Sequence, residues 1–295
     1  MIKVRVPATS ANMGPGFDCL GVAIQLYNYV SIEEYDGVKI DIIGDGEDFL
    51  PKDERNLVYQ SAMEIISRAD KTVKGLHLIL ENNIPITRGL GSSSASILGG
   101  MIAGNTLVGS PLTMQEILDI AAEKEGHADN VSPAVFGGFT VNSYNGKTVN
   151  SLKFPVPEDI CFAVFKPAFF LKTKKSRSVL PNTVSHHSAA TNTGNAAMLV
   201  GALLTGKYEF LKIGFSDELH QKFRKKLIPD MDYIFRVSEK HGALGSYLSG
   251  AGPTIISVIS KENVSFLENI KKDMEKYKKW QVDVYEPDND GAVIL

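Results

Sequence analysis

Glycine and serine crowd one short stretch of the chain that could bind an anion. It reads Pro85-Ile86-Thr87-Arg88-Gly89-Leu90-Gly91-Ser92-Ser93-Ser94-Ala95-Ser96. Glycine lets a backbone bend tightly and approach a ligand closely. The serines add hydroxyl and backbone N–H groups at the start of a predicted helix, where donors are unpaired and the helix dipole is positive. This chemistry suits phosphate, so the stretch predicts a phosphate-binding loop.

The spacing excludes two common nucleotide-binding patterns. The P-loop requires a lysine after its second glycine, but Gly91 is followed by Ser92. The dinucleotide fingerprint requires a third glycine, which is absent here. The remaining alternative is an ordinary helix start with small residues, because serine is a preferred cap. Three consecutive serines exceed what a cap requires.

Asn12 and Asp18 are the polar side chains of a glycine- and proline-rich segment, residues 9–21. The composition predicts a loop. In one interpretation both side chains bond to their own backbone in a turn. In the other, the loop forms one edge of a ligand site, because loops on a rigid scaffold often carry functional residues.

Glu125 stands near the end of a predicted helix, where the dipole disfavours a carboxylate. A bound cation would offset this, and Asp129 and Asn130 follow at once. The alternative is a surface turn with a capping asparagine. His127 has no partner at metal-ligand spacing, which favours a structural role.

Positive charge gathers later in the chain, between residues 172 and 177. Such a run usually forms a solvated face, but it could also bind an anion. Arg177 is the better candidate for that role, because the guanidinium grips a carboxylate in two places. Arg224 is a second arginine of interest, just before Leu227-Ile228-Pro229.

Alternating apolar residues predict strands over residues 4–8, 26–35, 38–43 and 75–80. Asp36-Gly37 is a strong hairpin signal, so residues 26–35 and 38–43 are expected to pair antiparallel. Helical spacing predicts helices over residues 56–69 and 93–107, and a third that starts with a capping box of Thr113 and Glu116 and ends near Gly126. Asn56 could cap the first helix or contact a nucleotide base.

The second half of the chain begins with a change of composition at residues 142–157. We therefore predict two domains, residues 1–150 and 151–295. A strand is expected over residues 162–165 and a helix over residues 193–204. A second glycine-rich turn at residues 248–253 leads into a β-α-β ending, with elements at residues 254–259, 264–276 and 281–285.

Composition limits the classes of function. The 295 residues are 43% apolar and 22% charged, with a net charge of −3, so no basic field favours nucleic acid or an anionic membrane. The two cysteines follow no metal or redox spacing, which predicts reduced thiols in a cytosolic protein. The first residues have no signal-peptide core, and no apolar run is long enough to span a bilayer.

Four segments together resemble the GHMP kinases, in the form found in homoserine kinases. Residues 85–96 resemble the family's phosphate motif, and residues 7–21 its first motif. Residues 248–254 resemble the third motif, and residues 125–133 the homoserine kinase version of the segment between them. The segments occur in the expected order along essentially the whole chain.

The resemblance implies an α+β fold. It comprises an N-terminal α/β domain like ribosomal protein S5 domain 2, which binds ATP, and a C-terminal ferredoxin-like domain that completes the substrate site. The implied reaction transfers the γ-phosphate of ATP to the side-chain hydroxyl of L-homoserine, a step of threonine synthesis. Ser93 and Glu125 would hold Mg²⁺, and Gly89 to Ala95 would wrap the phosphates. The nucleotide site would also include Asn56 and residues 85–88. The residues implied to hold homoserine are Asn12, Asp18, Asn130, Arg177 and Arg224.

The chemistry of these side chains fits a free amino acid. Asp18 suits the ammonium group, and Arg177 with Arg224 suits the carboxylate. Asn130 can hold the hydroxyl as donor or acceptor. Asp129 matches a catalytic aspartate of relatives such as mevalonate kinase. Homoserine kinases are thought to lack a dedicated base, so we expect Asn130 to orient the hydroxyl.

Three points stay open in the sequence. The connection between Glu125 and Asp129 is shorter than in some relatives, which leaves Glu123 as an alternative metal ligand. The substrate could be another small alcohol, or the chain could be a non-catalytic ligand sensor. A homodimer is plausible from frequency alone, and threonine, a near-isostere of homoserine, could enter the same site.

Overall fold

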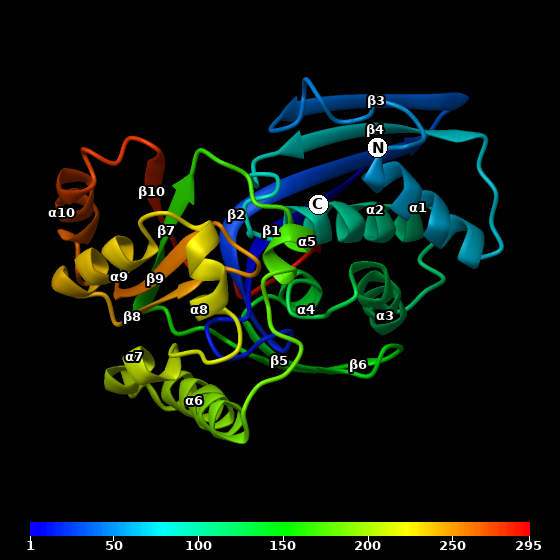
Figure 1. Ribbon diagram of the computed structural model, residues 1–295. Coiled ribbons are helices and arrows are strands. Elements are labelled where there is room, and N and C mark those ends of the chain that lie inside the picture. The colour runs from blue at the N-terminus through cyan, green and yellow to red at the C-terminus, as the bar shows by residue number, and fades with distance from the viewer.

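Two β-sheets, each with its own helices, make up the computed structural model, which describes residues 1–295 (Figure 1). The first sheet has seven strands in the order β11-β1-β2-β4-β3, with β5 paired to β2 and β6 paired to β5. Its strands are β1 (Ile2–Ala11), β2 (Leu20–Glu34), β3 (Gly37–Gly44), β4 (Gly75–Asn82), β5 (Phe139–Tyr144), β6 (Val149–Phe154) and β11 (Val293–Ile294).

Helix α2 (Ser92–Leu107) packs directly on β1 and β2, and α1 (Leu57–Arg68) packs on α2. Glycines in α2 allow this close approach. A Cβ at Gly100 would lie 2.4 Å from the carbonyl oxygen of Val58, and one at Gly104 would lie 2.8 Å from that of Ala62. The rest of this layer consists of α3 (Met114–Glu125) and α4 (Val131–Phe136). The helix that follows the glycine-rich loop is therefore held rigidly from both sides.

The predicted hairpin at Asp36-Gly37 is wrong. The chain does bend at Asp36, but β3 pairs in parallel with β4, and β4 pairs antiparallel with β2. The later strand β4 thus lies between β2 and β3. Glycine at position 75 permits this arrangement, because it has no side chain. A Cβ there would lie 2.0 Å from the carbonyl oxygen of Gly37. Turn chemistry is local and does not reveal a third strand that pairs with both neighbours.

The second sheet is antiparallel, in the order β10-β7-β9-β8. Its strands are β7 (Ile160–Pro167), β8 (Gly245–Leu248), β9 (Ile255–Ser260) and β10 (Trp280–Tyr285). Helix α9 (Met231–Lys240) lies between β7 and β8 in the chain, and α10 (Phe266–Asp273) between β9 and β10. This strand order and helix placement are ferredoxin-like, which confirms the predicted α+β fold of two domains.

Between β7 and α9 the chain forms a set of shorter elements and one long helix. These are α5 (Thr173–Arg177), α6 (His186–Thr205), a 3₁₀ turn (Tyr208–Phe210), α7 (Leu211–Gly214), α8 (Gln221–Arg224) and a 3₁₀ turn (Lys225–Leu227). Helix α6 starts seven residues before the predicted helix, because Ser185 caps it. None of the helices combines the length and apolar character that a membrane span requires.

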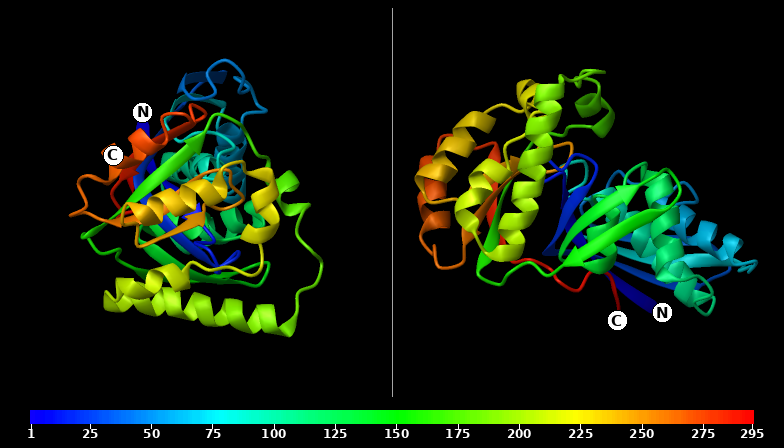
Figure 2. Two further views of the ribbon diagram at one scale, coloured as in Figure 1. Left: turned by 60° about the vertical axis from the view of Figure 1, so that its left-hand side comes forward. Right: turned by 90° about the horizontal axis from the view of Figure 1, so that it is seen from below.

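The end of the chain returns to the first sheet. Strand β11 pairs with β1, and the amide of Leu295 donates to the carbonyl oxygen of Lys3 over 2.8 Å. Figure 2 accordingly shows the two termini close together. Strand β6 also belongs to the first sheet as far as Phe154. The change between the two sheets along the chain therefore falls after Phe154, a few residues beyond the expected boundary at residue 150.

Other local expectations hold with small changes. The capping box of Thr113 and Glu116 starts α3, and Gly126 ends it in a left-handed conformation, as predicted. The first strand continues through Pro7 to Ala11, because the register with β2 shifts at that proline. The short helix α4 was not expected from the sequence.

Candidate active site

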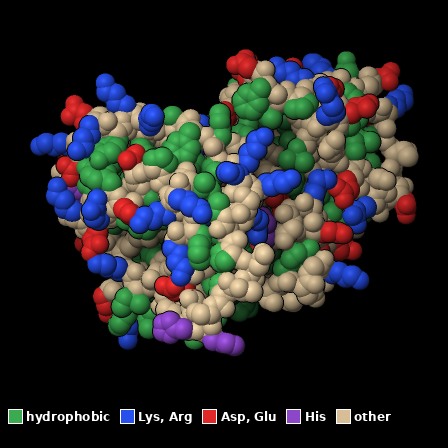
Figure 3. All heavy atoms as spheres, in the orientation of Figure 1, with side chains coloured by type: hydrophobic (Ala, Val, Ile, Leu, Met, Phe, Trp, Pro, Cys, Tyr) green, Lys and Arg blue, Asp and Glu red, His purple; other side chains and the backbone are tan.

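A cavity of about 410 Å³ lies where loops of both domains meet the N-terminus of α2. The loops that line it follow β1, α3 and β7, together with the second glycine-rich turn. On the face shown in Figure 3, lysine and arginine side chains surround the hollow between the two lobes. The cavity thus joins the regions that the sequence singled out.

Gly91, rather than a serine, occupies the cap position of α2. Its φ is 69°, and Gly89 has a φ of 80°, so both adopt the left-handed backbone that glycine tolerates. The serine-cap alternative is therefore wrong: Ser92, Ser93 and Ser94 form the first turn of the helix. Their backbone N–H groups are the unpaired donors that suit a phosphate. Ser93 is exposed in the cavity, whereas Ser92 and Ser94 are buried.

The glycine-rich loop is fastened on both sides. The amide of Thr9 donates to the carbonyl oxygen of Leu90 over 3.1 Å, and the amide of Thr254 donates to that of Arg88 over 3.1 Å. The hydroxyl of Ser249 donates to the carbonyl oxygen of Gly89 over 2.5 Å. The first and third predicted motifs thus hold the loop between them.

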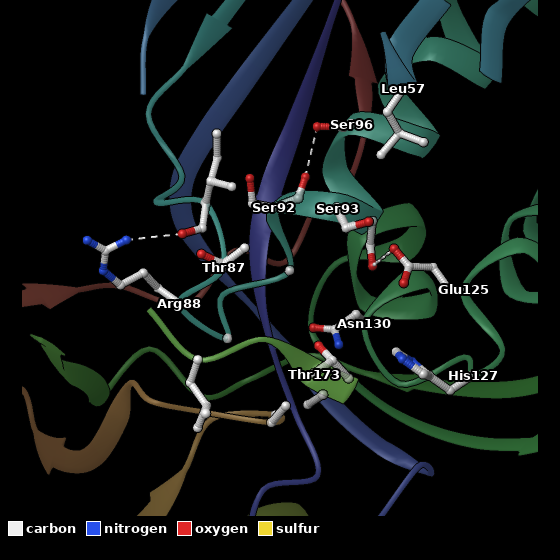
Figure 4. Close-up of a pocket in the computed structure, with 18 of the residues that line it drawn as sticks. Leu57, Thr87, Arg88, Ser92, Ser93, Ser96, Glu125, His127, Asn130 and Thr173 are labelled. Carbon is white, nitrogen blue, oxygen red and sulfur yellow. Dashed lines mark hydrogen bonds between the residues drawn. The ribbon is translucent and has the colours of Figure 1, made fainter. Parts of the chain in front are cut away.

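Glu125 ends α3 and faces the loop, near Ser93 and Asn130 (Figure 4). Its carboxylate accepts a hydrogen bond of 3.1 Å from the hydroxyl of Ser94. The neighbouring Glu123 is exposed and lies 4.0 Å from Arg68, away from the cavity. Of the two carboxylates, only Glu125 lines the cavity.

The donor set near Glu125 fits Mg²⁺ better than a transition metal. No group of three or more His, Cys, Asp or Glu side chains that could hold a metal occurs in the chain. Mg²⁺ is commonly bound by one or two carboxylates together with waters and substrate phosphates. Glu125 and the exposed hydroxyl of Ser93 beside a phosphate-binding helix start provide such a partial shell.

Asp129 is 2% exposed, and its Oδ1 lies 2.7 Å from Nδ1 of His127. The expected alternative of a surface turn is wrong, because Asp129 is buried. Burial lowers the pKa of His127, but Asp129, with Glu125 and Asp18, more than offsets this, so the pKa is raised above its usual value. His127 thus faces the carboxylate of Asp129, and both residues line the cavity.

Asn130 precedes α4 but does not cap it with its side chain. Instead its Oδ1 accepts a hydrogen bond of 2.9 Å from the hydroxyl of Thr9. The amide group of Asn130 lines the cavity, and its Nδ2 is left as the donor for a ligand oxygen. Thr9 thereby fixes which end of Asn130 is presented.

Asp18 and Arg177 form a bidentate ion pair across the cavity, with N–O distances of 2.7 and 3.1 Å. The backbone of Asp18 is left-handed, with a φ of 56°. Burial lowers the pKa of Arg177, but the Asp18 carboxylate outweighs it and raises the pKa. The lysines near Arg177 are exposed, so only the arginine of this basic run reaches the cavity.

Arg224 is the largest fully buried side chain, with 1% exposed, and it has no ion-pair partner. Its guanidinium donates to the carbonyl oxygens of Gly250 over 2.9 Å and Ser176 over 3.4 Å. Burial, together with the positive charge of Arg177, lowers the pKa of Arg224 to about 10. A buried cation with no direct ion-pair partner at the wall of a cavity fits an anionic ligand group.

Other predicted site residues mainly hold the walls together. Asn12 donates to the carbonyl oxygen of Gly250 and accepts from the amide of Asp18. Asn56 caps α1 and donates to the carbonyl oxygen of Pro51, as in the capping alternative, and it also lines the cavity. Arg88 points away from the serines (Figure 4). Its guanidinium donates to the carbonyl oxygens of Ile86 and Pro167.

Not every residue of the glycine-rich loop lines the cavity. Ile86, Thr87 and the glycines line the cavity, but Leu90 and Ala95 are fully buried in the core, and they and Pro85 do not line it. Three residues that the sequence did not single out as ligand contacts belong to the site or its support: Thr9, Thr173 and His220. Thr9 could have been found from the sequence because it lies within the first motif. No sequence signal marked Thr173 or His220.

Replacing Gly91 with alanine should destabilise the fold beyond the cost of backbone strain. A left-handed alanine costs roughly 1–2 kcal/mol. At Gly91 its Cβ would also lie 2.1 Å from the Thr9 hydroxyl. Gly109 is the matched control, because its φ is 89° and nothing lies within 4 Å of a Cβ there. Thermal unfolding should show a larger loss for Gly91→Ala; equal losses would contradict the close approach of Thr9.

Two family models match the chain, for the N-terminal domain of GHMP kinases at residues 56–138 and for their C-terminal domain at residues 198–275. Together they match more than half of the 295 residues. The chain belongs to the GHMP kinase family, which confirms the family predicted from the sequence motifs.

Relatives that match over their full length have a more specific name, homoserine kinase. A homoserine kinase of Caldicellulosiruptor saccharolyticus is 44% identical over 100% of this chain and 97% of its own length. A homoserine kinase of Clostridium botulinum is also 44% identical, over 100% and 99%. The crystal structure of homoserine kinase from Cytophaga hutchinsonii superposes with a TM-score of 0.88 at 31% identity, covering 100% of this chain and 97% of that one.

Proposed function

We propose that this kinase transfers the γ-phosphate of ATP to the side-chain hydroxyl of L-homoserine, producing O-phospho-L-homoserine for threonine synthesis. The observation that carries the proposal is one cavity that joins a phosphate-binding helix start to an acidic and two basic side chains. The names and full coverage of the relatives support the same substrate.

A zwitterion fits the charges in the cavity. We infer that the substrate ammonium binds Asp18 and that its carboxylate binds Arg177 and Arg224. Asp18 and Arg177 pair with each other in the structure, so their charges are balanced before an amino acid enters. A ligand that carries one charge of each sign can pair with both side chains, whereas a neutral sugar offers neither charge and a simple acid offers only the negative one.

ATP is the phosphoryl donor in this proposal, and its site is formed by Asn56 and by those members of residues 85–95 that line the cavity. The backbone from Gly89 to Ser94 would surround the phosphates, and Ser93 and Glu125 would hold Mg²⁺. Bound Mg²⁺ neutralises charge on the phosphate oxygens during transfer. Glu125 has the geometry for this role because it ends α3 opposite the start of α2.

Asn130 orients the acceptor hydroxyl in this proposal. Phosphoryl transfer through a loose transition state needs positioning and charge neutralisation more than a strong base. Asp129 is held beside His127 and is 2% exposed, which favours a structural role over proton abstraction. The hydroxyl proton then leaves to solvent or to a phosphate oxygen.

The Asp129→Asn variant should therefore keep kcat within about tenfold of the original protein, well short of the roughly 10⁴-fold upper range for losing a general base. The reason is that in this proposal Asp129 pairs with His127, while Asn130 orients the hydroxyl. Steady-state ADP release at saturating substrates measures this. A loss near four orders of magnitude with KM unchanged would make Asp129 the catalytic base.

The reaction itself is tested by ADP release with Mg-ATP and equal concentrations of L-homoserine, mevalonate, galactose or L-threonine. Turnover confined to L-homoserine is the expected result. Turnover with a different alcohol would retain the ATP site and discard the substrate assignment. No turnover with any of them, while ATP still binds, would favour a ligand sensor.

We also infer a cytosolic location, from two cysteines that are free in the structure. The homodimer stays a prediction based on frequency, and sedimentation of the purified protein measures it. Competition by L-threonine against L-homoserine in the same assay tests whether threonine enters the site.

A further inference from the structure

A short turn behind the cavity presents His220 and Arg224 on one face. The carboxylate of Asp217 accepts the backbone amides of Leu219 and His220, both over 2.9 Å, and that of Gln221. These bonds start the helical turn of α8. Residues four apart on a helix lie side by side, so His220 and Arg224 meet.

The partners of His220 define its protonation. Nε2 lies 2.7 Å from the carbonyl oxygen of Gly14, which can only accept, so Nε2 carries the proton. Nδ1 lies 3.1 Å from Nη1 of Arg224, which can only donate, so Nδ1 keeps its lone pair. Burial is the largest cause that lowers the pKa of this imidazole, and Arg224 adds to it while Asp217 opposes it. His220 is therefore neutral and fully buried.

All the hydrogen-bond partners of Arg224 are neutral: two carbonyl oxygens and this imidazole nitrogen. The ring of Phe17 lies 5.4 Å from the Arg224 guanidinium carbon, 5.3 Å from that of Arg177, and 5.3 Å from the ring of His220. Neutral partners fix the direction of the guanidinium without cancelling its charge. A carboxylate at position 220 would instead pair with Arg224.

We propose that His220 is a positioning residue: the lone pair on its Nδ1 holds the Arg224 guanidinium toward the carboxylate of the amino-acid substrate and leaves the arginine's charge for that substrate. The proposal rests on the proposed function, because it assigns the Arg224 site to a carboxylate. His220 itself does not line the cavity.

Two substitutions separate the two contacts of His220. A glutamine amide nitrogen can take the place of Nε2 and keep the bond to Gly14, but glutamine leaves no acceptor at Nδ1. An asparagine oxygen can take the place of Nδ1 and keep the bond from Arg224, but it loses Gly14. Hydrogen bonds to charged groups are worth enough for about a tenfold effect. We expect His220→Gln to raise the KM for L-homoserine about tenfold, with kcat and the KM for ATP within about twofold.

His220→Asn is the matched variant. Its KM for L-homoserine should stay within about threefold of that of the original protein. 3-Amino-1-propanol, which is homoserine without the carboxylate, provides the second comparison. Its kcat/KM should be the same with His220→Gln as with the original protein. If His220→Gln leaves the KM for L-homoserine unchanged, or weakens both alcohols equally, the proposal is wrong.

A further test uses the unsubstituted protein, so it does not require any variant to fold. The ¹⁵N shifts of the His220 ring should report a proton on Nε2 and a free lone pair on Nδ1, with and without L-homoserine. A protonated Nδ1 would overturn the proposal, because Arg224 could not donate to it. Failure of the original protein to phosphorylate L-homoserine would instead reject the proposed function.

Discussion

Replacing Glu125 with glutamine should lower kcat by about two to three orders of magnitude, the usual loss when one preorganised electrostatic group is removed. Glu125 is the carboxylate that lines the cavity at the start of α2. Glutamine keeps the size of the side chain and can still accept a bond from Ser94. It lacks the negative charge that a carboxylate supplies to bound Mg²⁺. The fold should therefore persist while phosphoryl transfer fails.

Glu123→Gln is the matched control, because it removes the same charge from the same helix. Its side chain is exposed and lies 4.0 Å from Arg68. Its activity should stay within about twofold of the original protein. Steady-state ADP release against Mg²⁺ concentration compares the variants, with the Glu125 variant needing more metal. If Glu123→Gln lost the activity and Glu125→Gln kept it, the proposed metal ligand would be the wrong residue.

Replacing Arg224 with methionine should raise the KM for L-homoserine by about 10- to 150-fold, the range that corresponds to a charge-assisted bond of about 1.5–3 kcal/mol. The side chain has 1% exposure and no acidic partner, so its charge is not needed to balance another residue. Burial lowers its pKa to about 10, which means that the fold disfavours the charge. Removing this charge offsets the cost of the three hydrogen bonds lost with the guanidinium, so Arg224→Met should change the melting temperature little.

Arg224→Lys separates charge from geometry. Lysine keeps the positive charge but lacks the planar fork that binds a carboxylate in two places. Its KM should fall between those of the original protein and Arg224→Met. The KM for 3-amino-1-propanol, which has no carboxylate, should change little in either variant. Equal weakening of this alcohol and of L-homoserine would show that Arg224 supports the whole cavity rather than the carboxylate.

Features encoded within a few neighbouring residues were predictable. The glycines before Ser92 do adopt left-handed backbone, and the box of Thr113 and Glu116 does start α3. Such features depend on turn chemistry, capping and periodic burial, which act over one or two turns of chain. The order of the four motifs also predicted the family and the ferredoxin-like second domain.

Features that depend on distant partners were not predictable. The chain does bend at Asp36, yet β4 lies between the strands on either side of the bend. Asp18 was expected to be free to bind an ammonium group. In the structure it pairs with Arg177, which is 159 positions away in the sequence. Nothing near His220 in the sequence shows that its ring would lie between Gly14 and Arg224.

The sequence by itself determined the chemistry that this protein has available: a phosphate-binding helix start, a carboxylate for a cation, and acidic and basic groups for a zwitterion. The tertiary structure decided which groups meet in one cavity and which are already satisfied by other residues. Local backbone preferences act between neighbours, whereas ion pairs and strand pairing form between segments that only the folded chain brings together.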